Sequence, residues 1–196
     1  ATRLMTPVMI LSDGYIANGS EPWRIPDVQA MEPIVIQHPT ESSDEKFLPY
    51  KRDALLARPW AIPGTEGLMH RLGGLEKEDR TGNVSYDAAN HQHMVNTRAQ
   101  KVRNVNDLVA PPTMFGQGSG DVLVVSWGGT FGACRTAVAQ LQAMGQAVSH
   151  LHLRWVNPLP SELGSIMAGF QKIVIPELNT GQLRQLIQGQ FLVAAH

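Results

Sequence analysis

The sequence predicts an α/β protein with a parallel sheet that is covered by helices on both faces, in three layers. Three short apolar runs are expected to form its buried strands, at residues 121–126, 147–153 and 172–175. Each run is followed by a Gly- or Pro-marked turn and a helix-like segment, which is the alternation typical of parallel sheets. Functional loops of such sheets lie at the carboxyl ends of the strands. Three turns are expected there, at Gly128-Gly129-Thr130, Asn157-Pro158 and Glu177-Leu178-Asn179.

Three helices are expected between and after these strands. The first begins at Thr130 as its N-cap and ends before Gly145, and its apolar stripe consists of Cys134, Ala137, Val138, Leu141 and Met144. The second begins near Pro160 and carries Leu163, Ile166, Met167 and Phe170, although two glycines weaken it. The third follows Asn179 and carries Leu183, Leu186 and Ile187.

Residues 7–11 are predicted to form one buried strand, which ends at the turn-prone Ser12-Asp13-Gly14. No second convincing strand lies close to it in the sequence. A lone strand cannot satisfy its ladder hydrogen bonds, so it must join the later sheet or belong to an upstream domain. We favour the upstream domain, and expect the native polypeptide to extend before Ala1.

A long segment, residues 38–120, connects this strand to the later sheet. One helix is expected within it, near residues 87–105, behind Asp87 as a cap. The segment is too apolar for a solvated linker, so we expect a fixed conformation that wraps a neighbour. Residues 110–120 carry Pro, Gly and Ser and are expected to be a hinge into the final domain.

Composition excludes several classes of function. The 16 Lys and Arg residues balance 17 Asp and Glu residues, for a net charge of −1, so no basic field would attract nucleic acid or an anionic membrane. Apolar runs are far shorter than the roughly 18 residues that span a bilayer. The single cysteine, Cys134, agrees with a reducing compartment, and we expect a cytoplasmic protein.

The turn at residues 127–132 partly matches a dinucleotide-binding fingerprint. The first glycine of this pattern permits a tight turn, and Trp127 stands in its place. The acidic residue that the pattern requires at the end of the second strand is also missing. A tight strand-to-helix turn is therefore the better interpretation than a nucleotide site. The amino terminus of the following helix could still attract an anion.

Histidines and the cysteine invite metal or nucleophile hypotheses, which we disfavour. His150 and His152 would share one face of a strand, but no carboxylate pair accompanies them. His91 and His93 would point in different directions on a helix. Cys134 lies on an apolar stripe, which favours a buried structural thiol.

Arg24 is the candidate site residue. It lies between two prolines and beside Trp23, and a rigidly placed guanidinium can clamp a carboxylate with two hydrogen bonds. The alternative is an arginine that stacks on Trp23 or pairs with Glu21 or Asp27. Lys77 and Arg80, which lie among acidic residues, are interpreted as a solvated charge cluster.

Several motifs together resemble one family along nearly the whole chain: the alpha subunits of 2-oxoacid:acceptor (ferredoxin) oxidoreductases, most closely the 2-oxoglutarate type. The motifs are Leu11-Ser12-Asp13-Gly14-Tyr15, Ala17-Asn18-Gly19-Ser20-Glu21-Pro22-Trp23-Arg24-Ile25-Pro26, Arg58-Pro59-Trp60-Ala61-Ile62-Pro63-Gly64-Thr65, Gly73-Gly74-Leu75-Glu76-Lys77, Thr81-Gly82-Asn83-Val84-Ser85 and Pro176-Glu177-Leu178-Asn179-Thr180-Gly181-Gln182-Leu183. Each motif alone is weak, and their combination is specific.

The resemblance implies a domain organisation for a C-terminal portion of such a subunit. Residues 1–37 would be the tail of a thiamin-pyrimidine domain, and residues 38–120 a family insert that acts as a long wrapped connector. Residues 121–196 would be a transketolase C-terminal-like domain. The glutamate that activates the thiamin pyrimidine would lie upstream of Ala1.

The resemblance also implies an activity. Family members convert 2-oxoglutarate and coenzyme A to succinyl-CoA and carbon dioxide, with thiamin diphosphate as cofactor, and electrons pass through an iron–sulfur cluster to ferredoxin. The beta subunit would bring the diphosphate site and the cluster, so this chain alone is expected to bind neither cofactor and to be inactive. Arg24 would bind the substrate carboxylate; no catalytic, cofactor-binding or metal-binding residue is assigned.

The sequence leaves other functions open. The chain could be a non-catalytic assembly domain, because a transketolase C-terminal-like domain chiefly packs against partner domains. A stand-alone nucleotide-binding domain is a further alternative. The preferred 2-oxoacid, the electron acceptor and whether the chain forms a homodimer are not determined by the sequence.

Overall fold

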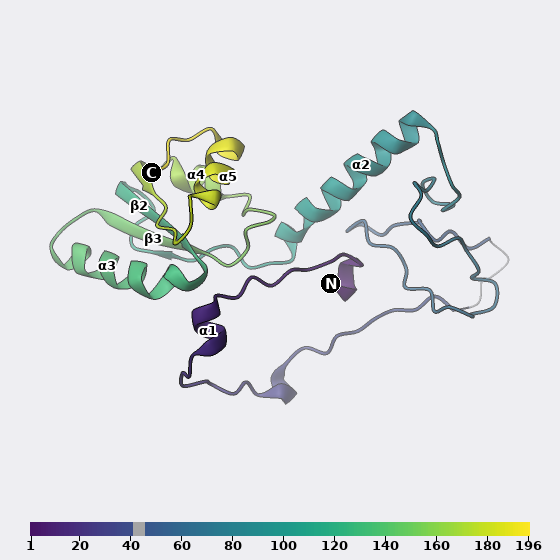
Figure 1. Cartoon of the computed structure of the whole chain (residues 1–196), viewed down its shortest axis with the longest axis horizontal. Coiled ribbons are helices and arrows are strands. Elements are labelled where there is room, and N and C mark those ends of the chain that lie inside the picture. Colours follow the sequence, from purple (N-terminus) through teal and green to yellow (C-terminus); the bar gives the residue numbers. More distant parts are fainter. Residues whose placement is uncertain (41–45) are drawn as a thin grey trace. The chain divides into compact units, whose positions relative to one another are not determined.

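The computed structural model describes residues 1–40 and 46–196, and these form two compact units. The connector unit comprises Ala1–Met9 and Trp23–Val105, and the sheet unit comprises Ile10–Pro22 and Asn106–His196. Figure 1 labels elements of both units, among them strands β2 and β3 of the sheet unit and the long helix α2 of the connector unit. Among the described residues, every helix is too short or too polar to span a lipid bilayer.

The sheet unit is built on four strands in the order β1-β3-β2-β4. The strands are β1 (Met114–Phe115), β2 (Gly120–Trp127), β3 (Val148–Leu153) and β4 (Phe170–Val174). The central strand β2 pairs in parallel with both β3 and β4. The predicted α/β class and its three parallel strands are therefore confirmed.

The edge strand β1 was not expected. Met114 and Phe115 lie in the segment predicted to be a hinge, yet they pair antiparallel with Leu151 and His150 of β3. A strand of two residues leaves no alternating pattern in the sequence, because the pattern needs at least four residues to be seen. Pro111 and Pro112 precede it, and proline is tolerated beside an edge strand.

The pairing register decides which residues face each side of the sheet. Val125 of β2 lies opposite Leu151 of β3, and Ser126 lies opposite His152. Side chains alternate along a strand, so Val125 shares one face with Leu151 and Leu153. Ser126 shares the other face with His150 and His152. One face of the sheet is therefore mostly apolar, although Ser149 also lies on it, and the other carries Ser126 and the two histidines.

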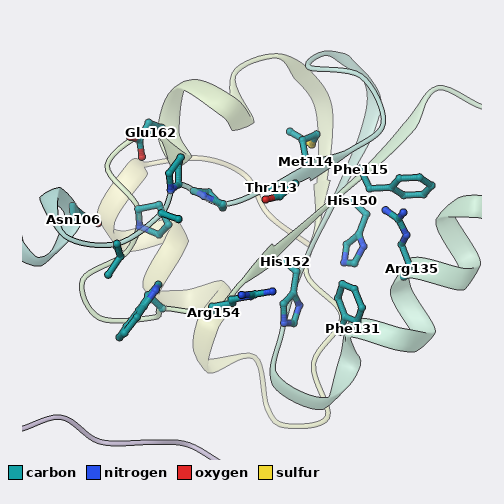
Figure 2. Close-up of a pocket in the computed structure, with 16 residues that line it drawn as sticks. Asn106, Thr113, Met114, Phe115, Phe131, Arg135, His150, His152, Arg154 and Glu162 are labelled. Carbon is teal, nitrogen blue, oxygen red and sulfur yellow. The ribbon is translucent and has the colours of Figure 1, made fainter. Parts of the chain in front are cut away.

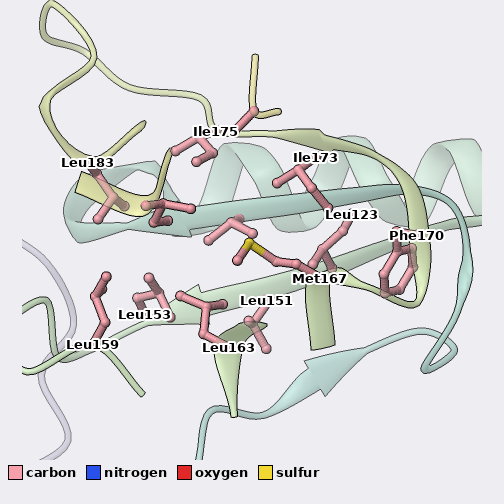
Figure 3. Packing of buried hydrophobic residues seen from close by; sticks show 13 residues of the cluster. Leu123, Leu151, Leu153, Leu159, Leu163, Met167, Phe170, Ile173, Ile175 and Leu183 are labelled. Carbon is pink, nitrogen blue, oxygen red and sulfur yellow. The ribbon is translucent and has the colours of Figure 1, made fainter. Parts of the chain in front are cut away.

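Helices cover both faces of this sheet, as the three-layer prediction requires (Figure 1). Helix α3 (Phe131–Ala143) packs on β2 and β3 through its buried Cys134 and Val138. On the apolar face, α4 (Leu163–Met167) and α5 (Gln182–Phe191) contribute to one buried cluster. Figure 3 shows this cluster, whose members are Leu123, Val125, Leu151, Leu153, Leu159, Leu163, Met167, Phe170, Ile173, Ile175, Leu183, Ile187 and Ala195.

The ends of α3 follow from its sequence with one difference. At its carboxyl end Gly145 adopts φ +81°, and its N–H donates to the Gln142 carbonyl while Gln146 N–H donates to Leu141. This pair of bonds is the Schellman motif, which a glycine permits. At the other end, the Thr130 hydroxyl donates to the Trp127 carbonyl instead of capping the helix.

Two helices differ from their predictions: the buried stripe of α3 is narrower and α4 is shorter. Leu141 and Met144, expected on the buried stripe of α3, are exposed, so this stripe is narrower than expected. Helix α4 spans five residues, and Phe170, expected on its stripe, begins β4 instead. The helix is shorter than expected because Gly164 lies within it and Gly169 follows it, and each glycine lowers helix propensity by about 1 kcal/mol.

Residues 7–11 do not form the predicted buried strand. They have no regular structure, and Met9 and Ile10 are 88% and 89% exposed. An apolar run becomes a strand only where another strand accepts its hydrogen bonds, and none in the described residues does so. The segment continues into helix α1 (Gly14–Asn18), whose N-cap is the Asp13 carboxylate.

The connector unit contains helix α2 (Ala88–Arg103), which confirms the helix predicted near residues 87–105. The Asp87 carboxylate accepts from Asn90 N–H as the expected cap, and Met94 is buried. Elsewhere the described part of this unit has little regular structure. Short 3-10 helices of the chain lie at Thr2–Leu4, Val28–Ala30, Asn104–Asp107 and Gly128–Thr130.

The prediction of a solvated charge cluster is wrong for Lys77. Its side chain is 3% exposed, and its ammonium donates to the carbonyls of Gly73 and Leu75 at 2.9 and 2.5 Å. Backbone carbonyl oxygens of the same loop thus satisfy the buried ammonium group. The pattern of charged residues in the sequence does not reveal such partners. Arg80 is exposed, as expected.

Two glycines of the sheet unit are expected to respond in opposite directions to substitution by alanine. Gly189 lies in α5 with open space around its missing Cβ, so Gly189→Ala should stabilise the chain by about 0.5–1 kcal/mol. Gly116 has φ +116°, and a Cβ there would lie 2.5 Å from Ser149 Oγ. Gly116→Ala should therefore destabilise the chain by more than about 1 kcal/mol. Urea unfolding followed by circular dichroism measures the free energy of unfolding of both variants. Equal changes in this free energy would contradict the prediction.

Candidate functional site

The carboxyl ends of β2 and β4 are joined by the Glu177 side chain. Its carboxylate accepts from the Trp127 indole at 3.2 Å, from Asn179 Nδ2 at 3.0 Å and from the backbone N–H groups of Leu183 and Arg184 at 3.0 Å each. The last two groups belong to the first turn of α5, where a negative charge is favoured by the helix dipole. Glu177 therefore ties the turn after β2 to the start of the last helix.

The environment of Glu177 keeps it ionised. Burial alone would raise the pKa of this carboxyl group, but the hydrogen bonds from Arg184 N–H, Asn179, Leu183 N–H and Trp127 outweigh burial and lower the pKa. With four donors on its oxygens, the group is engaged in holding the structure. We assign Glu177 a positioning role and not that of an acid or base.

The glycine turn after β2 does not form a phosphate cradle. Gly128 adopts φ +56°, and a Cβ at Gly129 would lie 2.9 Å from Asp13 Oδ2. The Asp13 carboxylate thus lies against the turn that would have to receive a pyrophosphate, and like charges would repel there. The tight-turn interpretation of residues 127–132 agrees with this geometry better than the dinucleotide one.

On the polar face of the sheet, Ser126 connects two histidines of the neighbouring strand. Ser126 Oγ lies 2.7 Å from His150 Nε2 and 2.8 Å from His152 Nδ1. Burial lowers the pKa of both rings; His152 and Arg135 lower the pKa of His150 further, and Arg154 that of His152. Neutral rings suit this geometry, because the hydroxyl can donate to one ring and accept from the other.

These histidines line a cavity of about 710 Å³ in the sheet unit (Figure 2). The Phe131 ring lies beside both, with its centroid 4.9 Å from that of His152 and 5.8 Å from that of His150. The Arg135 guanidinium lies over the Phe115 ring, 2.9 Å from its centroid. The full lining is Asn106, Val109, Ala110, Pro111, Pro112, Thr113, Met114, Phe115, Phe131, Arg135, His150, His152, Arg154, Trp155, Pro160 and Glu162.

This arrangement can bind but lacks the parts of a hydrolase. Ser126 is fully buried and does not line the cavity, and within the described chain no carboxylate orients either histidine. Cys134 is buried at 7% exposure, and burial raises the pKa of its thiol, which keeps it protonated. Its predicted structural role agrees with this burial.

Sequence reasoning found the His150–His152 pair but missed Ser126, Arg135 and Arg154. The spacing of two places the histidines on one face, as predicted, whereas Ser126 and Arg135 reach them from another strand and a helix. Of these three residues, only Arg154 could have been predicted from the sequence, because it follows His152 at the same spacing of two that separates His150 from His152. The other partners depend on strand pairing.

The remaining candidates belong to the connector unit and not to this cavity. Arg24 is exposed and is not among the residues that line the cavity. His91 and His93 on α2 contact different carboxylates, Glu76 at 2.7 Å and Asp79 at 3.5 Å. Across residues 1–40 and 46–196, no group of three or more His, Cys, Asp or Glu could hold a metal ion.

Substitution of Glu177 should weaken the fold at neutral pH and remove part of its pH dependence. The pKa of Glu177 is lowered in the folded state from its ordinary 4.5, so its stabilisation is present above pH 4.5 and lost as pH falls through the folded value. Glu177→Gln should cost about 1–2 kcal/mol at pH 7 and less at acid pH. Urea unfolding at several pH values tests this, with the exposed Glu162→Gln as the control. A cost that does not change with pH would contradict the assignment.

The chain is similar in sequence to subunits of 2-oxoacid oxidoreductases. It is 47% identical to the 2-oxoglutarate oxidoreductase subunit KorA of Mycobacterium tuberculosis, over 98% of this chain and 29% of the relative. It is 26% identical to subunit alpha of 2-oxoacid:ferredoxin oxidoreductase 1 of Aeropyrum pernix, over 95% of this chain and 30% of the relative. No family model matches the chain.

A solved structure supports the same relation. The 2-oxoglutarate:ferredoxin oxidoreductase of Magnetococcus marinus, solved with 2-oxoglutarate, coenzyme A and succinyl-CoA bound, superposes with a TM-score of 0.72 and 28% identity. The match covers 83% of this chain and 29% of that one. The chain thus spans less than a third of the length of the relatives it matches. Within that span, the resemblance to alpha subunits of 2-oxoacid:acceptor oxidoreductases is confirmed.

Proposed function

We propose that this chain works as part of a 2-oxoglutarate:ferredoxin oxidoreductase. The complete enzyme would oxidatively decarboxylate 2-oxoglutarate in the presence of coenzyme A, form succinyl-CoA and pass electrons to ferredoxin, in the cytoplasm. The observation that carries the proposal is the 47% identity to a 2-oxoglutarate oxidoreductase subunit over 98% of the chain. The similarity to the Magnetococcus marinus enzyme supports the same substrate.

The cofactors of such an enzyme do not fit the residues of this chain. An iron–sulfur cluster needs several cysteine thiolates, and the sequence has only Cys134, which is buried on α3. The diphosphate of thiamin diphosphate needs a metal or a phosphate cradle, and the glycine turn after β2 has the Asp13 carboxylate against it. We therefore derive no chemical step through either cofactor, and propose that a beta subunit and the rest of the alpha subunit hold them.

The chain's own contribution is structural and positional in this proposal. Exposed apolar side chains run through its first 36 residues, and such surface is commonly covered by a partner domain. The largest exposed fractions are those of Met9, Ile10, Tyr15, Trp23, Ile25 and Ile34. This surface favours the assembly role as a second function of the same chain, compatible with the first.

Activity should require the partners. The 196-residue chain with 2-oxoglutarate, coenzyme A and a dye acceptor is expected to be inactive, because it spans about 29% of its relative. The complete alpha subunit, produced together with the beta subunit, should reduce ferredoxin only when both substrates are present. Dye reduction by the chain alone would contradict the proposal, as would a complete enzyme that ignores 2-oxoglutarate.

Arg24 is proposed to bind a carboxylate of the substrate in the complete enzyme. Its side chain is exposed in this chain, which leaves the guanidinium available, and Pro22 and Pro26 flank it in the sequence. Arg24→Ala should raise KM for 2-oxoglutarate by about 10–100-fold, the cost of one charged bidentate contact. Arg24→Lys should recover part of this loss, and the exposed Arg71→Ala serves as the control. An unchanged KM in Arg24→Ala would remove the assignment.

A further inference from the structure

The proposed oxidoreductase function assigns no role to the cavity beside His150 and His152. It lies wholly within the sheet unit, and its volume of about 710 Å³ falls in the range of small-molecule sites, roughly 300–1,000 Å³. Its walls come from β1, β3, the start of α3 and the segments before β1 and after β3. Helix α3, β3 and the residue that follows β3 contribute all of its basic groups.

Two arginines and two neutral histidines follow one another along one wall of this cavity. Arg135 lies beside His150, and Arg154 lies beside His152, close enough for each arginine to lower the pKa of its neighbour. Figure 2 shows the four side chains in this order, with Arg135 and Arg154 at the two ends. Alternate residues of a strand are roughly 6–7 Å apart, so the row from His150 to Arg154 extends over roughly 13 Å.

The two arginines have no acidic partner within the described chain. The ion pairs of the described residues involve Arg52, Arg98, His91 and His93, and neither Arg135 nor Arg154 takes part in one. Glu162, which also lines the cavity, lies away from Arg135 in Figure 2. An anion that enters this cavity would therefore be attracted by both guanidinium groups.

The histidines add hydrogen-bonding capacity to this wall. Ser126 Oγ engages His150 Nε2 and His152 Nδ1, which fixes both rings. Of the two rings, His150 is 2% exposed, whereas His152 is only partly buried and presents its Nε2 side without a protein partner among the described residues. Arg135 is fixed in turn by its position over Phe115. The basic wall is thus held in place by the protein before any ligand binds.

We propose that this cavity binds a small phosphorylated molecule, with its phosphate groups along the wall from Arg135 to Arg154. A guanidinium binds phosphate oxygens with paired hydrogen bonds. Arg135 extends from α3 and Arg154 follows β3, so the two guanidinium groups at opposite ends of the wall fit a diphosphate or two separate phosphates better than one carboxylate. Trp155 and Val109 supply apolar surface for the rest of the molecule. This proposal is independent of the dinucleotide fingerprint, since the glycine turn takes no part in it.

Titration calorimetry on the 196-residue chain tests the proposal, with pyrophosphate, ADP, inorganic phosphate, succinate and adenosine as separate probes. Pyrophosphate and ADP should bind saturably, inorganic phosphate more weakly, and succinate and adenosine not measurably. Arg135→Gln and Arg154→Gln should each weaken pyrophosphate binding by about tenfold, as expected for one charged bidentate contact. Lys172→Gln removes one charge from an exposed position of the same unit, outside the cavity, and should leave the affinity unchanged.

A second measurement keeps the test valid if a variant does not fold. In the unsubstituted chain, pyrophosphate should shift the ring NMR signals of His150 and His152 and leave those of His91 and His93 unchanged. Absence of saturable pyrophosphate binding to the unsubstituted chain would overturn the proposal. Equal losses in Lys172→Gln and the arginine variants would do so too, because they would indicate nonspecific attraction. Succinate binding as tight as pyrophosphate would overturn the choice of phosphate.

Discussion

The parallel pairing of β2 with β3 is the constraint on which the rest of the sheet unit depends. Six residue pairs, from Val122–Val148 to Trp127–Leu153, set the register of this pairing. A shift by one residue would turn every side chain of one strand to the opposite face. Leu151 and Leu153 would then leave the buried cluster, and His150 would enter it. The same register that buries the core therefore assembles the polar wall of the cavity.

The two faces of the sheet differ in polarity, although the buried Ser149 lies on the apolar face and Val124 on the polar one. The apolar face is closed by α4 and α5, and its leucines and isoleucines are removed from water almost completely. On the other face α3 covers Ser126 and His150, and the hydroxyl and the rings satisfy one another. A buried polar group without such partners would cost roughly 1–3 kcal/mol. Because Ser126, His150 and His152 satisfy one another's hydrogen bonds, they can be buried beneath α3. The two histidines also form part of the cavity wall beside this helix.

The candidate sites differ in how far the sequence could predict them. The motif combination predicted the resemblance to alpha subunits of 2-oxoacid:acceptor oxidoreductases, because such motifs are local runs of residues. The 47% identity to a 2-oxoglutarate oxidoreductase subunit agrees with this resemblance. The cavity was not predicted, since Arg135 and Ser126 meet His150 only after α3 folds back on two paired strands. The burial of Lys77 was missed for a related reason: its partners are carbonyl groups, which every residue has and no pattern marks. Arg24 stays a prediction.

The sequence by itself determined the local elements: three strands, the Asp87 cap of α2 and the glycine that ends α3. These depend on propensity and on hydrogen bonds between residues near one another in the chain. Tertiary structure alone decided the edge strand β1, the loss of strand structure at residues 7–11 and the meeting of two arginines with two histidines. A strand needs a neighbour for its hydrogen bonds, and a binding wall needs side chains from separate elements. Both are properties of how the chain folds back on itself.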